Sequence, residues 1–232
     1  MGMNAKAAAE RRAEEQLDLL LRRYPLLETL RPDIKWACQL LCDCYEAGGK
    51  LLIAGNGGSA ADAEHIVGEL MKGFKQPRRL SEEQQAKLIA ASPELGPVLT
   101  AHLQQALPAI ALDGHPALST AYLNDCDPLL CFAQQVNGYG RAEDVLLVIS
   151  TSGKSKNILY AAVTAQAKGM KVIGLTGAAK SPLLSLCDVC IRVPLQETYQ
   201  IQELHLPIYH CLCLMLEAYF FGTEKNCPPI EW

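Results

Sequence analysis

The stretch that decides the fold is Leu51-Leu-Ile-Ala-Gly-Asn-Gly-Gly-Ser-Ala-Ala-Asp-Ala-Glu-His-Ile-Val-Gly-Glu-Leu70. Residues 51–54 form a short apolar run that is typical of a parallel strand buried on both faces. Three glycines at 55, 57 and 58 then allow a sharp turn and a close approach of the backbone to a ligand. Ser59 is a good N-cap residue, so we expect a helix to begin there. A strand, a glycine turn and a helix N-terminus in succession predict an anion site, most often used for phosphate.

The predicted helix carries a second pattern, one turn beyond the glycine turn. His65 and Glu69 are four residues apart, so their side chains share one face of the helix. Such a pair can be an ordinary surface contact, and a glycine turn can occur without a ligand. Taken together, the two patterns indicate a phosphate-binding turn beside a pair suited to proton transfer or metal binding.

Two other phosphate-binding motifs do not fit this stretch. Gly55, Gly57 and Ala60 match the G-x-G-x-x-[G/A] fingerprint of dinucleotide binding. That fingerprint requires an acidic residue about 20 positions later, at the end of the next strand. Residues 73–79 are basic instead and do not read as a strand. A Walker A loop is excluded because no Gly-Lys-Ser/Thr closes the turn.

Composition restricts the class of protein. A chain of 232 residues fits one α/β domain with a helical preface, and it can bury a full core. The net charge of −4 argues against a general nucleic-acid binder. No apolar run approaches the roughly 20 residues of a membrane span, and the N-terminus lacks the apolar core of a signal peptide. We therefore expect a cytoplasmic protein with no nucleic-acid or membrane partner.

Ten cysteines raise the question of a metal or disulfide framework. Two pairs of cysteines lie two residues apart in helical patterns, where the side chains diverge and cannot chelate together. Cys187 and Cys190 have C-x-x-C spacing, but no second pair follows at zinc-ribbon distance. Reduced, partly buried thiols are the expected state.

The remaining segments alternate between helices and strands. Two amphipathic helices are expected ahead of the first strand, and they should pack on a partner subunit or across the sheet. The segments predicted in this way are helices at 5–23 and 32–47, strands at 109–112, 144–150, 171–176 and 189–193, and a helix that ends near Gly138.

Residues 78–107 form an insert after the helix that carries His65 and Glu69. Ser81 and Gln84 make a capping-box pattern, which predicts a helix through about Ala91. Proline and glycine residues then punctuate the chain, and a second helix through Leu107 follows. We expect this helical pair, apolar on one side, to cover the mouth of the site or a subunit seam.

A second polar loop follows the strand at 144–150. It reads Ser150-Thr-Ser-Gly-Lys-Ser155 and leads into a helix, so hydroxyl groups and a helix N-terminus come together again. The carboxyl ends of neighbouring parallel strands meet at one edge of an open α/β sheet. Many short hydrogen bonds are what a sugar phosphate needs, since both its hydroxyls and its phosphate must be held.

The final helix, expected over residues 198–221, contributes further polar side chains. Gln202 and His210 are eight residues apart and lie on a broad shared face. Pro207 lacks a backbone donor, and we expect it to kink the helix. His205 is expected to pack or cap, whereas His210 alone is compatible with either a structural or a functional role.

These residues together resemble one protein family. The motifs are the glycine turn 55–59, the His65/Glu69 pair, Asn124-Asp125, the loop 150–155, and Ile201-Gln-Glu-Leu-His205 with His210. Over roughly residues 35–221 they are similar to the sugar isomerase (SIS) domain family, of the phosphoheptose isomerase type. The resemblance implies a three-layer α/β fold with a flavodoxin-like, five-stranded parallel sheet and helices on both faces. It also implies a single SIS domain over 1–232, with N-terminal helices at 1–47 and a helical insert at 78–107.

The same resemblance implies a homotetramer with active sites between subunits, and one zinc ion (Zn2+) per subunit. Glu69 is then the expected catalytic base and His210 its catalytic partner. The matching metal ligands are His65, Glu69, Gln202 and His210. Two imidazoles, a carboxylate and an amide oxygen form a suitable zinc set, although glutamine is an uncommon ligand. The residues expected to bind substrate are Asn56, Gly57, Gly58, Ser59, Glu69, Asn124, Asp125, Ser150, Thr151, Ser152, Ser155 and Gln202.

The function implied is isomerisation between an aldose and a ketose phosphate. The specific expectation is conversion of sedoheptulose 7-phosphate to D-glycero-D-manno-heptose 7-phosphate through a zinc-assisted enediol. The alternative is a non-catalytic SIS protein of the DnaA-initiator-associating type, which binds a sugar phosphate or a protein partner. That type lacks the residues matching Glu69 and His210, so their presence here favours the enzyme. Two features depart from the family pattern: the segment Lys72-Gly73-Phe74, where the family usually has Gly-Arg-aromatic, and the insert 78–107.

Overall fold

Five parallel strands form the centre of the structure, a computed structural model that describes residues 3–222. The strands lie side by side in the order β2-β1-β3-β4-β5. This is the flavodoxin-like order that the resemblance implied, so the predicted fold class is confirmed. The strands are β1 (Leu51–Gly55), β2 (Ala109–Ala111), β3 (Val145–Ile149), β4 (Lys171–Thr176) and β5 (Val189–Arg192).

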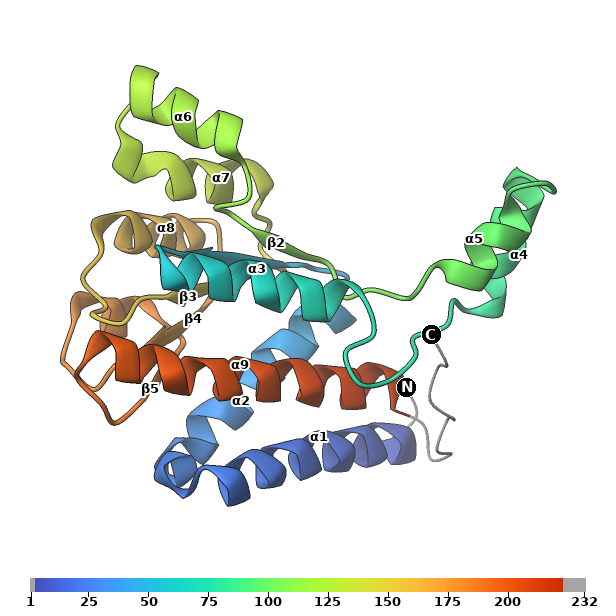
Figure 1. Cartoon of the computed structure of the whole chain (residues 1–232), viewed down its shortest axis with the longest axis horizontal. Helices are drawn as coiled ribbons and strands as arrows, with labels where there is room; N and C mark the ends of the chain where they lie inside the picture. The colour runs from blue at the N-terminus through green and yellow to red at the C-terminus, as the bar shows by residue number, and fades with distance from the viewer. Residues whose placement is uncertain (1–2, 223–232) are drawn as a thin grey trace.

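Helices cover both faces of the sheet (Figure 1). Alternate strand residues enter two apolar clusters, because successive side chains of a strand point to opposite faces. Leu52 of β1 belongs to the cluster under α7 and α8, and Leu51 to the cluster formed with α1, α2, α3 and α9. The helices are α1 (Met3–Arg23), α2 (Arg31–Glu46), α3 (Gly58–Met71), α4 (Glu82–Ala91), α5 (Gly96–His102), α6 (Pro116–Asp125), α7 (Cys131–Tyr139), α8 (Lys156–Ala167) and α9 (Thr198–Phe221), with 3-10 turns η1 (Pro25–Leu30), η2 (Pro128–Leu130) and η3 (Pro182–Leu186).

The two N-terminal helices pack against other elements of the same chain. α2 lies against α9 and β5, while α1 packs along the outer side of α9 (Figure 1). Leu17 and Leu21 of α1 are buried in this contact layer. Of the two packing modes expected from the sequence, α2 therefore takes the one across the sheet, and α1 adds a further layer beyond α9.

α9 is the central helix of this face. It continues without a break through Pro207. Of the helices in residues 3–222, it alone has the length and apolar character to cross a membrane, but 67% of that apolar window is buried inside the fold. A helix enclosed on several sides by its own chain is a core helix, and this finding is weak support for a membrane span.

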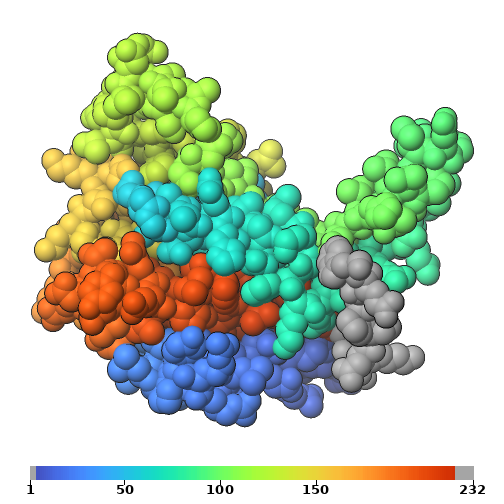
Figure 2. Space-filling model, in the orientation of Figure 1, coloured from blue at the N-terminus to red at the C-terminus, as the bar shows by residue number. Residues whose placement is uncertain are grey.

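The insert forms a helical hairpin that projects from the body of the molecule (Figures 1 and 2). The predicted capping box is present, with Ser81 and Gln84 each bonding the other's backbone N–H. The second helix ends at His102 rather than at Leu107, because Gln104 pairs with Arg79 in an antiparallel bridge. No residue of α4 is buried, so within this chain the hairpin does not lie over the body.

Candidate functional site

The turn between β1 and α3 is tighter than the sequence predicted. α3 begins at Gly58, and its N-cap is Gly57, whose φ of +56° lies in the region that favours glycine. A Cβ on Gly55 would lie 2.2 Å from the carbonyl oxygen of Ser59, so no side chain fits there. The expectation that Ser59 caps the helix is wrong, since Ser59 is already inside the first turn and buried. The N-terminus of α3 still faces the turn, where its dipole favours an anion.

Gln202 of α9 closes this turn from the other side. A Cβ on Gly58 would lie 2.6 Å from Nε2 of Gln202, so the missing side chain at Gly58 makes room for the amide. Gln202 and His210 are eight residues apart on α9, which is about 12 Å along the helix axis. The structure thus places Gln202 with the glycine turn, at the substrate-binding end expected for it, and two turns away from His210.

Two asparagines join the polar loops. Nδ2 of Asn157 donates to Oδ1 of Asn56 at 2.7 Å, and Nδ2 of Asn56 donates to Oδ1 of Asn157 at 3.1 Å. Asn56 follows β1, and Asn157 lies in the first turn of α8, which follows β3. The reciprocal bonds hold the two loops at a fixed distance. Asn157 was not among the predicted site residues, although a polar residue in the first turn of the helix after a hydroxyl-rich loop was a usable signal.

The hydroxyl-rich loop is organised by its own side chains. Oγ of Ser150 accepts the N–H of Gly153 at 3.2 Å and lies 3.5 Å from Oγ of Ser155. Ser155 is the N-cap of α8, but its side chain makes no capping bond, so its hydroxyl remains available to a ligand. Oγ of Ser152 accepts the N–H of Lys154 at 3.2 Å. Thr151, Ser152 and Lys154 line a cavity of about 130 Å³ that reaches Thr198 at the start of α9.

Asn124 and Asp125 are a further polar motif that the sequence predicted for the site. They end α6, a helix that sequence analysis did not predict, and both residues are exposed. Nδ2 of Asn124 donates to Oδ1 of Asp125 at 2.6 Å. The side chains of this pair thus bond each other. Their contact with substrate stays a prediction.

His65, Glu69 and His210 form a second cluster, further along α3 and α9. Nε2 of His65 lies 3.3 Å from Oε1 of Glu69. The rings of His65 and His210 stand edge to face, with centroids 4.9 Å apart. These three residues, predicted from opposite ends of the sequence, are neighbours because α3 and α9 pack side by side. A base, an imidazole and a third polar group in one place can move a proton.

Two polar atoms of this cluster are buried without a hydrogen-bond partner, namely Oε2 of Glu69 and Nε2 of His210. Lys72 Nζ lies 3.5 Å from Oε2 of Glu69, which is an ion-pair distance without a hydrogen bond. Burial, helped by the nearby His65, lowers the pKa of His210, so its ring favours the neutral form. Within residues 3–222, no group of three or more histidine, cysteine, aspartate or glutamate side chains is arranged to hold a metal ion. His65, Glu69 and His210 are neighbours but do not form a closed ligand shell.

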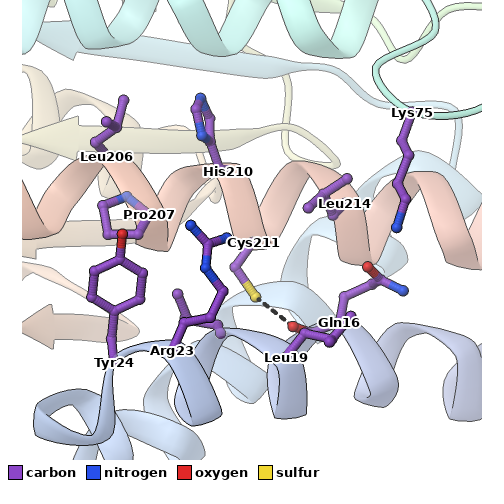
Figure 3. A pocket seen from close by; sticks show the side chains of 11 residues that line it. Gln16, Leu19, Arg23, Tyr24, Lys75, Leu206, Pro207, His210, Cys211 and Leu214 are labelled. Carbon is purple, nitrogen blue, oxygen red and sulfur yellow. Dashed lines mark hydrogen bonds between the residues drawn. The ribbon is translucent and has the colours of Figure 1, made fainter.

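A cavity of about 250 Å³ opens beside His210, between α1 and α9 (Figure 3). Its base is apolar, formed by side chains such as Leu19, Pro207 and Leu214. Arg23 and Lys75 line its rim, and in the described part of the chain neither side chain forms an ion pair. The rim is therefore positively charged and suits an anionic ligand.

Several other polar, ionisable or thiol-bearing residues lie outside these clusters. His205 is fully buried, which agrees with the packing role expected for it, and burial lowers its pKa to about 4. The nine described cysteines are all free thiols, as predicted. Tyr209 and the Arg78–Glu217 pair were missed by the sequence analysis, because each acts across more than 130 residues of chain.

Comparison with known proteins defines the class first. The model of the SIS domain matches residues 18–88 and 85–177, which is more than half of the chain. The chain therefore belongs to the SIS-domain family.

Within that family, the chain is similar to phosphoheptose isomerases. The phosphoheptose isomerase of Rhodospirillum rubrum is 39% identical over 186 residues, which cover 80% of this chain and 85% of that protein. The one from Thiobacillus denitrificans is 37% identical over 201 residues, covering 85% and 89%. Among solved structures, a phosphoheptose isomerase from Francisella tularensis superposes with a TM-score of 0.68 at 33% identity, covering 88% of this chain and 95% of that one. One from Neisseria gonorrhoeae superposes with a TM-score of 0.65 at 30% identity and the same coverage.

Proposed function

We propose that the chain is a phosphosugar isomerase that converts sedoheptulose 7-phosphate to D-glycero-D-manno-heptose 7-phosphate. The observation that carries this proposal is that His65, Glu69 and His210 lie together in the structure. They do so in a SIS-domain chain that is similar to phosphoheptose isomerases. Oε2 of Glu69 is buried and has no hydrogen-bond partner, as suits a carboxylate kept free to take a proton.

Each residue group has a role in this chemistry. Conversion of the ketose removes a proton from C1, forms an enediol and returns a proton to C2. Glu69 takes the proton from C1. His210 protonates and deprotonates the neighbouring oxygens, for which a neutral imidazole is suited. The hydroxyls of Ser150, Ser152 and Ser155, together with the N-termini of α3 and α8, hold the phosphate.

The separation of the two clusters supports a long substrate. Ser59, at the glycine turn, and Glu69 are ten residues apart on α3, which is about 15 Å along the helix axis. An open-chain heptose phosphate can extend from the phosphate-binding loops toward Glu69, whereas a triose phosphate is too short. The distance between the loops and the base therefore favours a large sugar phosphate over a small one.

Zinc is the proposed cofactor, one ion per subunit, held by His65, Glu69, Gln202 and His210. The donor set suits zinc, and the unpartnered Nε2 of His210 is one of the proposed ligand atoms, while Glu69 would bind through Oε1 and keep Oε2 as the base. Nε2 of His65 and Oε1 of Glu69 lie 3.3 Å apart, close to the separation of about 3.4 Å between two ligands of a tetrahedral zinc ion. Bound zinc would supply polarisation of the C1 and C2 oxygens. Gln202 would need to turn from the glycine turn toward His210 to join this set.

We further propose that the protein works as a homotetramer in the cytoplasm, with active sites between subunits. The composition supports a cytoplasmic enzyme. The projecting α4–α5 hairpin and the exposed Asn124–Asp125 pair support a site that a second subunit completes.

Turnover of sedoheptulose 7-phosphate in D₂O, followed by NMR, tests the proposal. Proton transfer through an enediol predicts an aldose product that carries deuterium at C2. Binding of the sugar phosphate without turnover, in protein supplied with zinc, would instead support a non-catalytic SIS protein and overturn the enzymatic assignment.

A further inference from the structure

The tip of the α4–α5 hairpin, residues 93–98, presents apolar side chains that its own chain does not cover. Leu95 and Val98 are 61% and 59% exposed, and because they are three residues apart they lie on one side of the start of α5. Glu94 precedes them and is exposed as well. The hairpin points away from the body of the molecule (Figure 2), and no residue of α4 is buried. Large apolar side chains gathered on a projecting tip indicate a contact surface for a partner.

The hairpin is held by contacts at both of its ends. Near the tip, a Cβ on Gly96 would lie 2.6 Å from Cα of Ile89, so α5 packs directly on α4. At the base, the N–H of Gln105 donates to the carbonyl oxygen of Arg78 at 2.7 Å, and Arg78 is itself bonded to Glu217 in the core. A projection that is already ordered loses little conformational entropy when it binds, so the tip is suited to docking.

The cavity of about 250 Å³ between α1 and α9, here called the groove, has properties that match this tip (Figure 3). Its base is apolar and includes Leu19 and Leu214. Arg23 and Lys75 line its rim, and neither pairs with an acidic side chain within residues 3–222. The groove therefore suits a ligand that is apolar at its centre and negatively charged beside it.

The size of the groove fits the tip rather than the whole hairpin. Gln16 and Tyr24 both line it and are eight residues apart, which is about 12 Å along the axis of α1. A helix with its side chains is about 10–12 Å wide, so one helix end fills this length. α4 has ten residues and is about 15 Å long, so the tip stands far enough from its own body to enter a groove on another molecule.

The two surfaces also carry opposite charges. Residues 82–103 of the hairpin contain three glutamates and one lysine, whereas the rim of the groove contributes two cations. We propose that the tip of one copy of this chain docks in the groove of a second copy. Leu95 and Val98 then lie on the apolar base, and the Glu94 carboxylate lies between Arg23 and Lys75. Two copies that exchange hairpins fill both grooves, which closes the assembly.

Docking of the tip also affects the candidate site, because His210 lines the groove. A tip from the second copy shields this side of His210 from water, so the site is complete only in the assembly. This consequence rests on the proposed function, in which His210 acts on the substrate. The docking itself does not, and it is measured without substrate.

Cross-linking of the full-length chain tests the contact directly. Unlabelled and ¹⁵N-labelled chains are incubated together, and native mass spectrometry confirms that mixed oligomers have formed. A carbodiimide then joins carboxylates to amines that touch. We expect a cross-link between Glu94 and Lys75 in which one peptide is labelled and the other is not. Arg23→Lys offers a second amine and should add a cross-link from Glu94 to position 23, whereas Glu82 at the base of the hairpin should reach neither position.

Association measured by analytical ultracentrifugation is the second test. Leu95→Asp and Arg23→Glu should each weaken association by about 10-fold or more. Leu123→Asp and Arg22→Glu are the matched controls and should have no effect. Leu123 is 69% exposed on α6, and Arg22 is exposed beside Arg23 but does not line the groove. Glu94→Lys combined with Arg23→Glu in one chain should recover most of the loss, because the exchange restores opposite charges.

Mixing two defective chains separates this contact from others. A chain with residues 82–102 replaced by a Gly/Ser loop keeps the groove, and a chain with Arg23→Glu and Lys75→Glu keeps the tip. Each alone should form a smaller oligomer, and the mixture should recover a larger one. A contact between two hairpins would not recover on mixing and would overturn the proposal. So would cross-links from Glu94 confined to chains of one label, or their absence in both the parent and Arg23→Lys. An active enzyme without this contact removes only the docking, whereas an inactive protein that shows it removes only the isomerase assignment.

Discussion

Arg78 and Glu217 form a buried ion pair that ties the last helix to the segment after α3. Nε of Arg78 donates to Oε1 of Glu217 at 2.9 Å, and neither side chain is more than 1% exposed. Arg78 also donates to the carbonyl oxygens of Leu70 and Glu69 at 2.7 and 3.0 Å. The Glu217 carboxylate accepts the N–H groups of residues 74–76. This pair holds the end of α3, next to Glu69, against α9.

We expect Arg78→Met to lower the free energy of unfolding by about 3–5 kcal/mol, because Glu217 would then be a buried charge without its cation. Urea denaturation measures the change. Adding Glu217→Leu should restore only part of it, since the N–H groups of residues 74–76 would lose their acceptor. Lys87→Met, which removes an exposed i,i+4 pair with Glu83, should change stability by less than about 1 kcal/mol. Equal effects of the two single variants would contradict this account.

Glu69→Gln should reduce kcat by about 10²–10⁴-fold while leaving the fold intact, because the amide keeps the shape of the side chain and removes the base. The rate of heptose phosphate isomerisation and the circular dichroism spectrum check both parts. Glu64→Gln is the control, since Glu64 is exposed on the same helix and should be silent. A Glu69→Gln variant with near-parent kcat would show that another group is the base.

Chelator treatment should remove one zinc ion per chain together with the activity, and added zinc should restore both. His210→Ala should lower zinc content measured by elemental analysis, because it deletes a proposed ligand. His102→Ala should leave zinc content unchanged, since His102 is exposed at the end of the projecting hairpin. Full turnover by metal-free protein would refute the zinc proposal.

Stability should fall as the pH drops from about 6.5 to 4. Burial lowers the folded-state pKa of His205 to about 4, below the unfolded value of 6.5, so in this window the unfolded chain binds a proton that the folded chain does not. The contribution of His205 is thus present above pH 6.5 and is lost as the pH falls, by about 3 kcal/mol in total. Urea denaturation with chelator present, at several pH values, should show a weaker dependence for His205→Leu than for His102→Leu. Identical slopes would exclude His205 as the source.

Replacing residues 82–102 by a short Gly/Ser loop should leave the free energy of unfolding nearly unchanged, because no side chain of α4 is buried in the body of the chain. The hairpin exposes large apolar side chains, including Leu95 and Val98. Such a surface needs cover, so the trimmed chain should form a smaller oligomer in light scattering. Unchanged oligomer size, KM and substrate range together would show that the hairpin has no part in a lid or seam.

The local units of this protein were predictable from its amino-acid sequence. The strand and glycine turn at 51–58, the Ser81–Gln84 capping box and the His65/Glu69 pair all depend on interactions within a few residues, so their patterns are visible in order along the chain. The family motifs added the strand order, which the structure confirms. The start of α3 was predicted wrongly because it depends on the backbone conformation of Gly57. Gly57, rather than Ser59, is the N-cap of this helix.

The contacts between distant side chains became visible in the folded chain alone. Tyr209 and His65 are 144 residues apart, Arg78 and Glu217 are 139 apart, and Asn56 and Asn157 are 101 apart. Each pair exists because packing of α3, α8 and α9 around the sheet brings together residues whose sequence neighbourhoods carry no sign of the partner. The position of Gln202 could not be predicted for the same reason. Its amide occupies the space that the absent side chain of Gly58 leaves beside the glycine turn. Hydrogen-bond partners across a core depend on packing distances of a few ångströms, which no periodicity along a single chain records.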